Sequence, residues 1–430
     1  PEIVLISTED GRQSWDLDPD RPDSGEGLKL PLINRLIIED GRVSLDARGG
    51  DLTLDAAVSA RESASAADGE TGFLLTGEGS INGSPLTLRV KGGPFINIRR
   101  DRPYRFEAVL AGARSRLVAD GAITRPFDFG RFTSSLKLEG RDLNDLYPLT
   151  GLTLPSTPPY RLSGALTRDA GLWTFNDLAG RVGASDLSGD VRVDAVGRLR
   201  VEADLASQRL DIDDLMALLG ADTRTNAAGT DTTTISSGGA PGRLLPNATL
   251  QVDRLRTMDG VLTYRAVSVK ANDLDIRTVR LAAKLQDGVL DLDPVSFAFN
   301  RGELNGTARI NATRDMPYSA IDFRLAGYPL ESIIPLRGGV APLSGRALGR
   351  ARLEGPGASI HTFAAASKGS ISLVVPRGEL RTAFAELLGI NASAGLTRLL
   401  RGDQSRSTIR CGVADFNVSG GVARAQTLVV

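Results

Sequence analysis

Apolar and polar residues alternate with a period of two along most of this 430-residue chain. The clearest run is residues 199–205, where Leu, Val, Ala and Leu alternate with Arg, Glu and Asp. Residues 52–58 and 86–90 follow the same rule. Because successive side chains of a β-strand point to opposite faces, each run predicts a strand with one apolar and one polar face. The chain is therefore expected to be mainly β.

Short pairs of a polar residue and a glycine separate many of these runs. Such pairs supply the positive φ angles of tight hairpins, so they predict that consecutive strands are antiparallel. The pairs are Asp40-Gly41, Asn82-Gly83, Asp120-Gly121, Asp287-Gly288 and Asn305-Gly306. At about 14 residues per strand and turn, the chain predicts roughly 25 to 30 strands. One open twisted sheet rarely holds so many strands, and the sheet is therefore expected to curl, split or coil along an axis.

Helical patterns are few and short. Residues 142–147 and 211–219 begin among carboxylates, which suit a helix N-terminus. A longer amphipathic helix is predicted near 380–400, where Leu380, Phe384 and Leu387 follow helical spacing. Such a stripe favours core packing over a membrane-surface role, and plugging or capping an open sheet is a further interpretation of this helix.

A weak repeat links strands to short helices. Residues 135–143, 203–210 and 322–330 each place an alternating strand five residues ahead of a leucine that opens a helical turn. The repeat predicts a body in which each unit contacts mainly its neighbours.

A low-complexity run of Thr, Ser, Gly and Ala at residues 221–242 has almost no large apolar side chain. It cannot bury enough surface to offset the entropy of ordering and is predicted to be a disordered loop. This loop is predicted to divide the chain into a first part, residues 1–220, and a second part, residues 243–430. The chain starts at Pro1 without Met and stops at Val430 within an alternating run, so we expect it to be part of a longer protein.

Composition excludes several classes of function. The chain has 51 basic and 52 acidic residues, a net charge of -1, and so lacks the basic field of a dedicated nucleic-acid binder. One cysteine excludes an intramolecular disulfide framework and Cys-rich metal sites, and one histidine excludes multi-His metal centres. There is no nucleophile elbow and no phosphate-binding Gly-rich loop. We expect neither catalysis nor a metal or cofactor.

The remaining reactive residues are assigned to structure. His361 lies in a strand-like run and is expected to be structural or exposed, and Cys411 is expected to be a small packed side chain in an alternating strand. Asp211, Asp213 and Asp214 are interpreted as helix-start residues, and Asp16 to Asp20 as solvated surface because the glycine of a calcium loop is missing there.

The apolar face of the predicted sheet must either pack on another sheet or line a groove. Periodicity alone favours the closed core of a β-sandwich or β-helix. The residue types favour the groove, because Leu, Val, Ile and Ala dominate and aromatics make up 5% of the chain. Such a wall suits acyl chains, since sheltering about 14 methylenes from water gains on the order of 10 kcal/mol. The candidate lining residues are Leu52, Leu54, Val58, Leu86, Leu88, Val90, Leu136, Leu138, Val191, Val193, Leu199, Val201, Leu205, Leu281, Leu285, Phe297, Phe299, Phe323, Leu325, Ile371 and Leu373.

Four stretches resemble the AsmA family of Gram-negative bacteria, relatives of the bridge-like lipid-transfer proteins. They are residues 1–15, which end in a Ser-Trp pair; the strand-Asp-Gly-strand pattern of residues 33–45; Leu152 to Tyr160, followed by Gly183 to Gly189; and residues 408–416, followed by Gly420-Gly421. The motifs are loose, but their order is specific and they extend over nearly the whole chain.

The resemblance implies a long antiparallel sheet curled like a taco, whose apolar groove carries phospholipid toward the outer membrane. It implies a periplasmic protein that is anchored to the inner membrane by an N-terminal helix outside this segment, has no catalytic residues, and binds phospholipid acyl chains and outer-membrane or periplasmic proteins. The alternative is a non-catalytic periplasmic scaffold that assists outer-membrane protein assembly. A polysaccharide-acting enzyme on a β-helix would need paired carboxylates and aromatic platforms, for which the sequence supplies no convincing cluster.

Overall fold

A computed structural model describes residues 1–7, 14, 35–47, 52–63, 72–93, 103–112, 114–123, 130–147, 154, 156–218, 252–271, 275–332, 343–382 and 405–429. These residues form two compact units, unit 1 (residues 1–197) and unit 2 (residues 198–430). Each unit is built mainly of β-strands, as the alternation predicts. The predicted boundary at 221–242 lies outside the described residues and stays a prediction.

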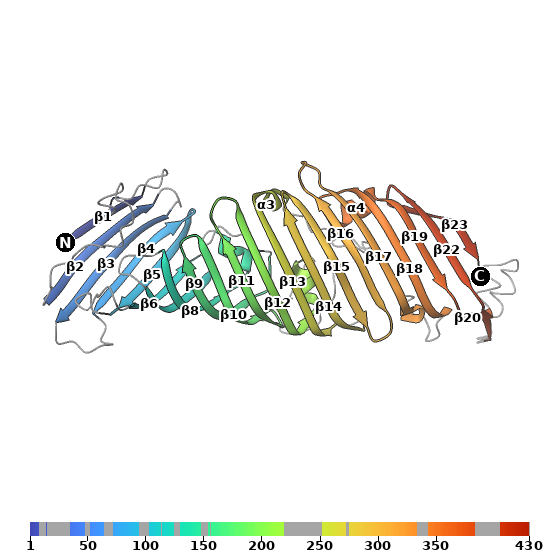
Figure 1. The fold of residues 1–430 in the computed structure, drawn as a ribbon, viewed down its shortest axis with the longest axis horizontal. Helices are drawn as coiled ribbons and strands as arrows, with labels where there is room; N and C mark the ends of the chain where they lie inside the picture. Colours follow the sequence, from blue (N-terminus) through green and yellow to red (C-terminus); the bar gives the residue numbers. More distant parts are fainter. Residues whose placement is uncertain are drawn as a thin grey trace, which may run out of the picture. The chain divides into compact units, whose positions relative to one another are not determined.

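Unit 1 is an antiparallel sheet that begins with one parallel pair. Its elements are β1 (Glu2–Ser7), β2 (Arg35–Ala47), β3 (Leu52–Ser63), β4 (Phe73–Ile81), β5 (Ser84–Gly92), β6 (Tyr104–Gly112), β7 (Ser115–Ile123), β8 (Arg131–Gly140), the 3-10 helix η3 (Leu143–Leu146), β9 (Tyr160–Asp169), β10 (Leu172–Val182) and β11 (Ser185–Asp194). Strand β1 pairs in parallel with β2, and from β2 to β11 each strand pairs antiparallel with the next (Figure 1).

Unit 2 repeats this plan. Its elements are β12 (Leu199–Asp211), α2 (Ile212–Leu218), α3 (Val252–Thr257), β13 (Met258–Lys270), β14 (Ile276–Gln286), β15 (Val289–Phe299), β16 (Glu303–Asn311), β17 (Tyr318–Pro329), the 3-10 helix η4 (Leu330–Ser332), β18 (Leu343–Pro356), α4 (Ile360–Ala366), β19 (Lys368–Val375), β20 (Gly378–Arg381), β21 (Arg406–Ile409), β22 (Gly412–Ser419) and β23 (Val422–Val429). Strand β12 pairs in parallel with β13, and antiparallel pairing continues through β19 to β22 and β23. Strands β20 and β21 extend one end of β18.

The two parallel pairs depart from the predicted uniform antiparallel order. Parallel neighbours cannot be joined by a tight hairpin, because the chain must return to the end of the sheet from which it started. The segment between β12 and β13 makes this return, and α2 and α3 lie at its two ends. The predicted low-complexity run falls within this crossover.

Within each unit the strands contact mainly the strands to which they are hydrogen-bonded. Apart from the short β20–β21 extension of β18, the described strands of each unit belong to one continuous hydrogen-bonded sheet and form no second sheet. The closed sandwich that periodicity alone favoured is therefore not the fold of these residues. The same part of the chain contains no helix that is long and apolar enough to span a membrane.

Short helices close the ends of three strands at the leucines of the repeat. Leu143 opens η3 after β8, and Leu330 opens η4 after β17. Leu210 lies at the end of β12, two residues before α2 begins. Leu210 and Leu330 are buried, and Leu143 packs beside buried Leu146. The leucine at each of these three strand ends therefore belongs to a small apolar cluster. The helices predicted at 142–147 and 211–219 are thereby confirmed.

Two of the five predicted polar-Gly hairpins are confirmed. Asn82-Gly83 and Asp287-Gly288 form tight turns with positive φ at both residues. Asp40-Gly41 instead forms a bulge within β2. Asp120-Gly121 and Asn305-Gly306 lie inside β7 and β16, so these two turn predictions are wrong. There the glycine allows a neighbouring strand to approach, because a Cβ atom would collide with that strand.

Two single-residue expectations are also wrong. His361 lies in α4 rather than in a strand, because Ser359 caps this helix and forms a capping box with Thr362. Cys411 is exposed between β21 and β22 rather than packed within a strand. In the helix predicted near 380–400, Leu380 lies in β20, and residues 383–400 are outside the described part of the chain.

Candidate functional site: the apolar sheet faces

The strand register of unit 1 aligns the apolar residues into rows that cross the sheet. Residues directly opposite each other on paired strands share a face, so the register shows which side chains lie together. One row consists of Val58, Leu75, Val90, Ala108, Ala119 and Leu136. A second consists of Leu88, Leu110, Leu117, Leu138 and Leu162. These rows belong to one surface, the apolar face of unit 1.

All ten candidate lining residues of unit 1 lie on this face. Val58, Leu86, Leu136 and Val193 are buried, and the other six are partly buried. A bulge in β10, between Phe175 and Leu178, puts Phe175 opposite Val191 and Trp173 opposite Val193. Without this bulge the two aromatic side chains would change faces, which is a register effect that the local sequence does not reveal.

Unit 2 has an equivalent apolar face. Leu205 pairs with Tyr264, which pairs with Leu281. Further along, Phe323 lies opposite Ala351, which lies opposite Ile371. All eleven candidate residues of this unit lie on the same face; Leu285 is buried, and the other ten are partly buried. The sequence prediction therefore places its candidates together within each unit.

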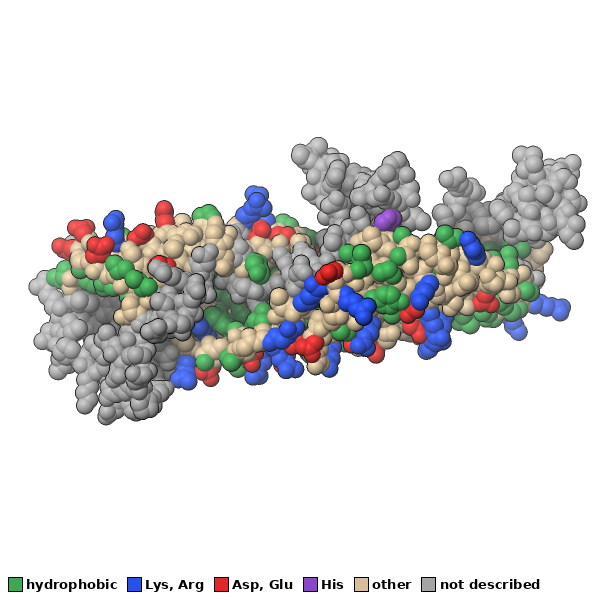
Figure 2. Space-filling view, turned by 90° about the horizontal axis from the view of Figure 1, so that it is seen from above, with side chains coloured by type: hydrophobic (Ala, Val, Ile, Leu, Met, Phe, Trp, Pro, Cys, Tyr) green, Lys and Arg blue, Asp and Glu red, His purple; other side chains and the backbone are tan. Residues whose placement is uncertain are grey.

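Aromatic rings converge over the centre of the apolar face of unit 1. Phe106, Phe132 and Trp173 lie on β6, β8 and β10, so each is two strands from the next. Their ring centroids are 6.2 Å and 6.0 Å apart, although such strands are about 9.6 Å apart in a flat sheet. Figure 2 shows hydrophobic side chains within a hollow of this unit, between walls that carry charged side chains.

One cation on this face, Arg168, is not among the residues predicted from the sequence. Arg168 lies opposite both Phe132 and Trp173, at the end of β9, and its guanidinium is 4.5 Å from the centre of the Trp173 ring. Its Nε donates to the Ala170 carbonyl oxygen at 3.1 Å. An arginine stacked on tryptophan suits the boundary between an apolar surface and water. The alternation of apolar and polar residues in β9 predicts that Arg168 lies on the apolar face. Its aromatic neighbours, however, follow only from the register of β9 with β8 and β10.

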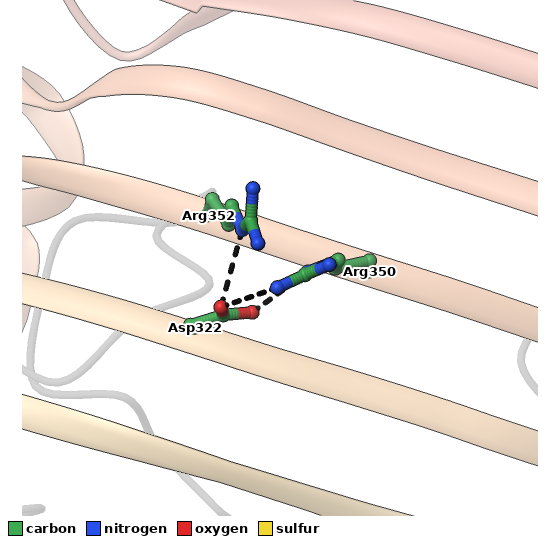
Figure 3. Close-up of polar contacts among 3 residues, drawn as sticks. All are labelled: Asp322, Arg350 and Arg352. Carbon is green, nitrogen blue, oxygen red and sulfur yellow. Dashed lines mark hydrogen bonds and ion pairs between the residues drawn. The ribbon is translucent and has the colours of Figure 1, made fainter.

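The opposite face of each sheet is polar and contains ion pairs between neighbouring strands. In unit 2, the Arg350 Nη2 atom lies 2.7 Å from Asp322 Oδ2, and Arg352 Nε lies 3.1 Å from the same oxygen (Figure 3). The hydrogen bonds from Arg350 are the main cause of a lowered Asp322 pKa, about 2. Across the neighbouring strands, Lys368 Nζ lies 3.2 Å from Glu354. The two faces thus separate alkyl-compatible surface from charged surface.

Two depressions adjoin the polar side chains. One, of about 1040 Å³ in unit 2, is lined by acids and bases in near balance, including Asp291, Asp322, Arg309, Arg352 and Lys368. The other, of about 660 Å³, lies in unit 1. Four arginines and one glutamate line this smaller depression: Arg114, Arg116, Arg161, Arg181 and Glu139. This cluster is not apparent from the sequence, because Arg116, Arg161 and Arg181 are distant in the chain and only strand pairing brings them together.

The described residues contain no group of three or more His, Cys, Asp or Glu side chains that could hold a metal ion. These faces offer apolar surface close to the charged side chains of the polar faces. They can shelter alkyl chains from water while leaving polar groups at the strand ends.

Comparison with known proteins agrees with the resemblance. The AsmA family profile matches residues 62–428. The chain is also similar to the AsmA family protein YhjG of Escherichia coli (strain K12), with 24% identity over 457 aligned positions. The alignment covers 99% of this chain and 66% of the relative, so the chain spans less than two thirds of that protein's length. No solved structure matches the chain. With the profile matched over most of its length, the chain belongs to the AsmA family.

Proposed function

We propose that this protein binds phospholipid through its acyl chains on the two apolar faces and conducts it between the inner and outer membranes. In this proposal it acts in the periplasm, is anchored to the inner membrane by a segment outside this chain, and supports outer-membrane biogenesis without catalysing a reaction. Membership of the AsmA family, which is linked to outer-membrane biogenesis or lipid transport, supports this assignment.

One observation carries the proposal: in each unit all candidate apolar residues share one face, and the described strands form no second sheet that could cover it. Most of these side chains are partly buried rather than enclosed. An apolar surface left incompletely covered favours a hydrophobic ligand. Lipid chains fit this surface, because about 0.8 kcal/mol is gained for each methylene removed from water.

A charge placed on the apolar face tests the proposal. Val201→Asp and Leu205→Asp each put a carboxylate among the side chains of β12, and a photoreactive residue at Ala203 reports lipid contact on the same face. We expect lipid crosslinking to fall at least about tenfold, since an unpaired carboxylate costs several kcal/mol in an apolar site. Val261→Asp is the matched control, because Val261 pairs with Glu202 on the polar face and is 40% exposed.

Undiminished crosslinking in a folded Val201→Asp protein would contradict the assignment. Purified protein that carries no phospholipid in native mass spectrometry would instead support the scaffold alternative.

A further inference from the structure

The arginine depression of unit 1 lies where its polar and apolar faces meet. Its lining combines Arg116 and Arg161 on the polar face with Gly140 and Tyr160 on the apolar face, and Arg114 contributes from the β6–β7 turn. Tyr160 is 4% exposed and belongs to the apolar cluster around Leu162. A ligand in the depression would therefore touch charge on one side and lie next to the apolar face on the other.

The arginines are placed where they repel one another. Arg161 on β9 and Arg181 on β10 are directly opposite across the strand pair. Like charges in this position destabilise a sheet. Glu139 is the one carboxylate of the lining; Arg161 Nε lies 3.5 Å from it and Arg116 Nε lies 4.0 Å from it. Asp186 pairs with Arg181 on its other side but is not part of the lining. The lining retains an excess of three positive charges.

The guanidinium groups are accessible to a ligand. The side chains of Arg116 and Arg161 are 52% and 84% exposed, and Arg114 and Arg181 are also exposed. Guanidinium groups match the oxygen geometry of phosphate and form paired hydrogen bonds with it. A phosphate between Arg161 and Arg181 would remove their repulsion.

We propose that this depression binds a phosphate group, supplied by the headgroup of a lipid whose acyl chains lie on the adjoining apolar face. The inference rests on the proposed lipid-binding function and deepens it, because it assigns a headgroup class to one edge of unit 1. The ligand is an anionic phosphodiester or phosphomonoester lipid.

The experiment compares two lipids with identical acyl chains, dioleoylphosphatidylglycerol and dioleoylglycerol, which lacks phosphate. The full chain is incubated with each lipid, and retained lipid is quantified by mass spectrometry after gel filtration. We expect the unaltered protein to retain about tenfold more phosphatidylglycerol, and the preference to weaken as salt is raised. The double variant Arg161→Gln/Arg181→Gln should lose the preference while retaining dioleoylglycerol.

The control removes the same charge elsewhere on the polar face. Lys137→Gln/Arg192→Gln alters β8 and β11 outside the depression and should keep the preference. Arg114→Gln/Arg116→Gln is a second test variant in case the first fails to fold. A folded test variant with an unchanged preference would overturn the phosphate site and leave the proposed function intact.

A second arm titrates inorganic phosphate into lipid-free protein by calorimetry. If the unaltered protein retains neither lipid but binds inorganic phosphate through Arg161 and Arg181, the phosphate site stands with free phosphate as its source, and the proposed lipid function fails. If it binds neither lipid phosphate nor inorganic phosphate, the site is rejected.

Discussion

At the scale of single residues, the ion pair of Asp322 with Arg350 makes the stability of the folded protein depend on pH. Arg350 holds it with two hydrogen bonds of 2.9 Å and 2.7 Å. The Asp322 pKa falls from its usual 3.8 to about 2 in the folded protein. Because the folded pKa is the lower one, the pair stabilises the fold fully above about pH 4, and this contribution is lost as pH falls from 4 toward 2.

We therefore expect Asp322→Asn to lower the free energy of unfolding at pH 7 by about 1 kcal/mol. This figure is reduced for screening, since about a third of each side chain is exposed. The difference from the unaltered protein should shrink between pH 4 and pH 2, as measured by urea unfolding. Asp291→Asn is the control, because Arg309 Nε is 3.5 Å from Asp291 and one contact of this length contributes little. A deficit that persists undiminished at pH 3 would contradict the assigned role.

Replacing either of two serines on the apolar face of unit 1 by alanine is expected to change the stability in opposite directions. Ser134 Oγ is buried and has no hydrogen-bond partner among the described residues, whereas buried Ser115 Oγ lies 2.8 Å from the Tyr160 hydroxyl. Ser134→Ala should be neutral or stabilising by up to about 1 kcal/mol, because it removes an unpaired hydroxyl. Ser115→Ala should cost about 1 to 2 kcal/mol, because it leaves the Tyr160 hydroxyl unpaired. Unfolding midpoints in urea compare the two, and equal losses would refute the distinction.

At the scale of the element, glycines inside strands allow close approach between neighbours. A Cβ atom on Gly306 would collide with the Asp322 carbonyl oxygen and the Phe323 ring. A Cβ atom on Gly349, on the same face of unit 2, would make ordinary contacts of 3.6 Å with Leu325 and Leu373. The same residue type thus has different roles at two positions of one sheet.

Gly306→Ala should destabilise unit 2 by about 1 to 3 kcal/mol through overpacking. Gly349→Ala should be neutral or slightly stabilising, since it reduces the entropy of the unfolded chain without strain. Thermal unfolding monitored by circular dichroism distinguishes the pair. Equal tolerance of both changes would show that the β16–β17 spacing is not set by Gly306.

At the scale of the whole molecule, cohesion comes from neighbouring strands and from small separate clusters. One cluster surrounds Leu136 in unit 1, and another surrounds Val279 in unit 2. Folds that are held by nearest-neighbour contacts lose cooperativity as they lengthen. The two units are therefore expected to unfold as separate cooperative blocks.

In scanning calorimetry, the calorimetric enthalpy should exceed the van't Hoff enthalpy. Leu136→Ala should lower the midpoint of one transition and Val279→Ala that of the other, since each removes buried side-chain volume at a cost of about 2 to 4 kcal/mol. Both variants shifting one shared two-state transition would show that the units unfold together.

The sequence predicted most of the apolar side chains on the two apolar faces, but few of the charged residues at the borders of these faces. Alternation alone placed Leu205 and Leu281 on the apolar face, and the Leu143 and Leu330 signals identified two helical stops. These signals are local, because side-chain direction follows from strand geometry and helix starts depend on nearby residues. Arg168 was missed because its aromatic partners come from two other strands.

By itself, the sequence determined a mainly β chain with one apolar and one polar face per strand. Tertiary structure alone decided which polar-Gly pairs turn and which lie within strands, where the parallel pairs form, and that Arg161 and Arg181 stand opposite each other. The physical reason is that the period of two fixes which way a side chain points, whereas its neighbours depend on register. Register is set by pairing and bulges between segments that are separate in the chain.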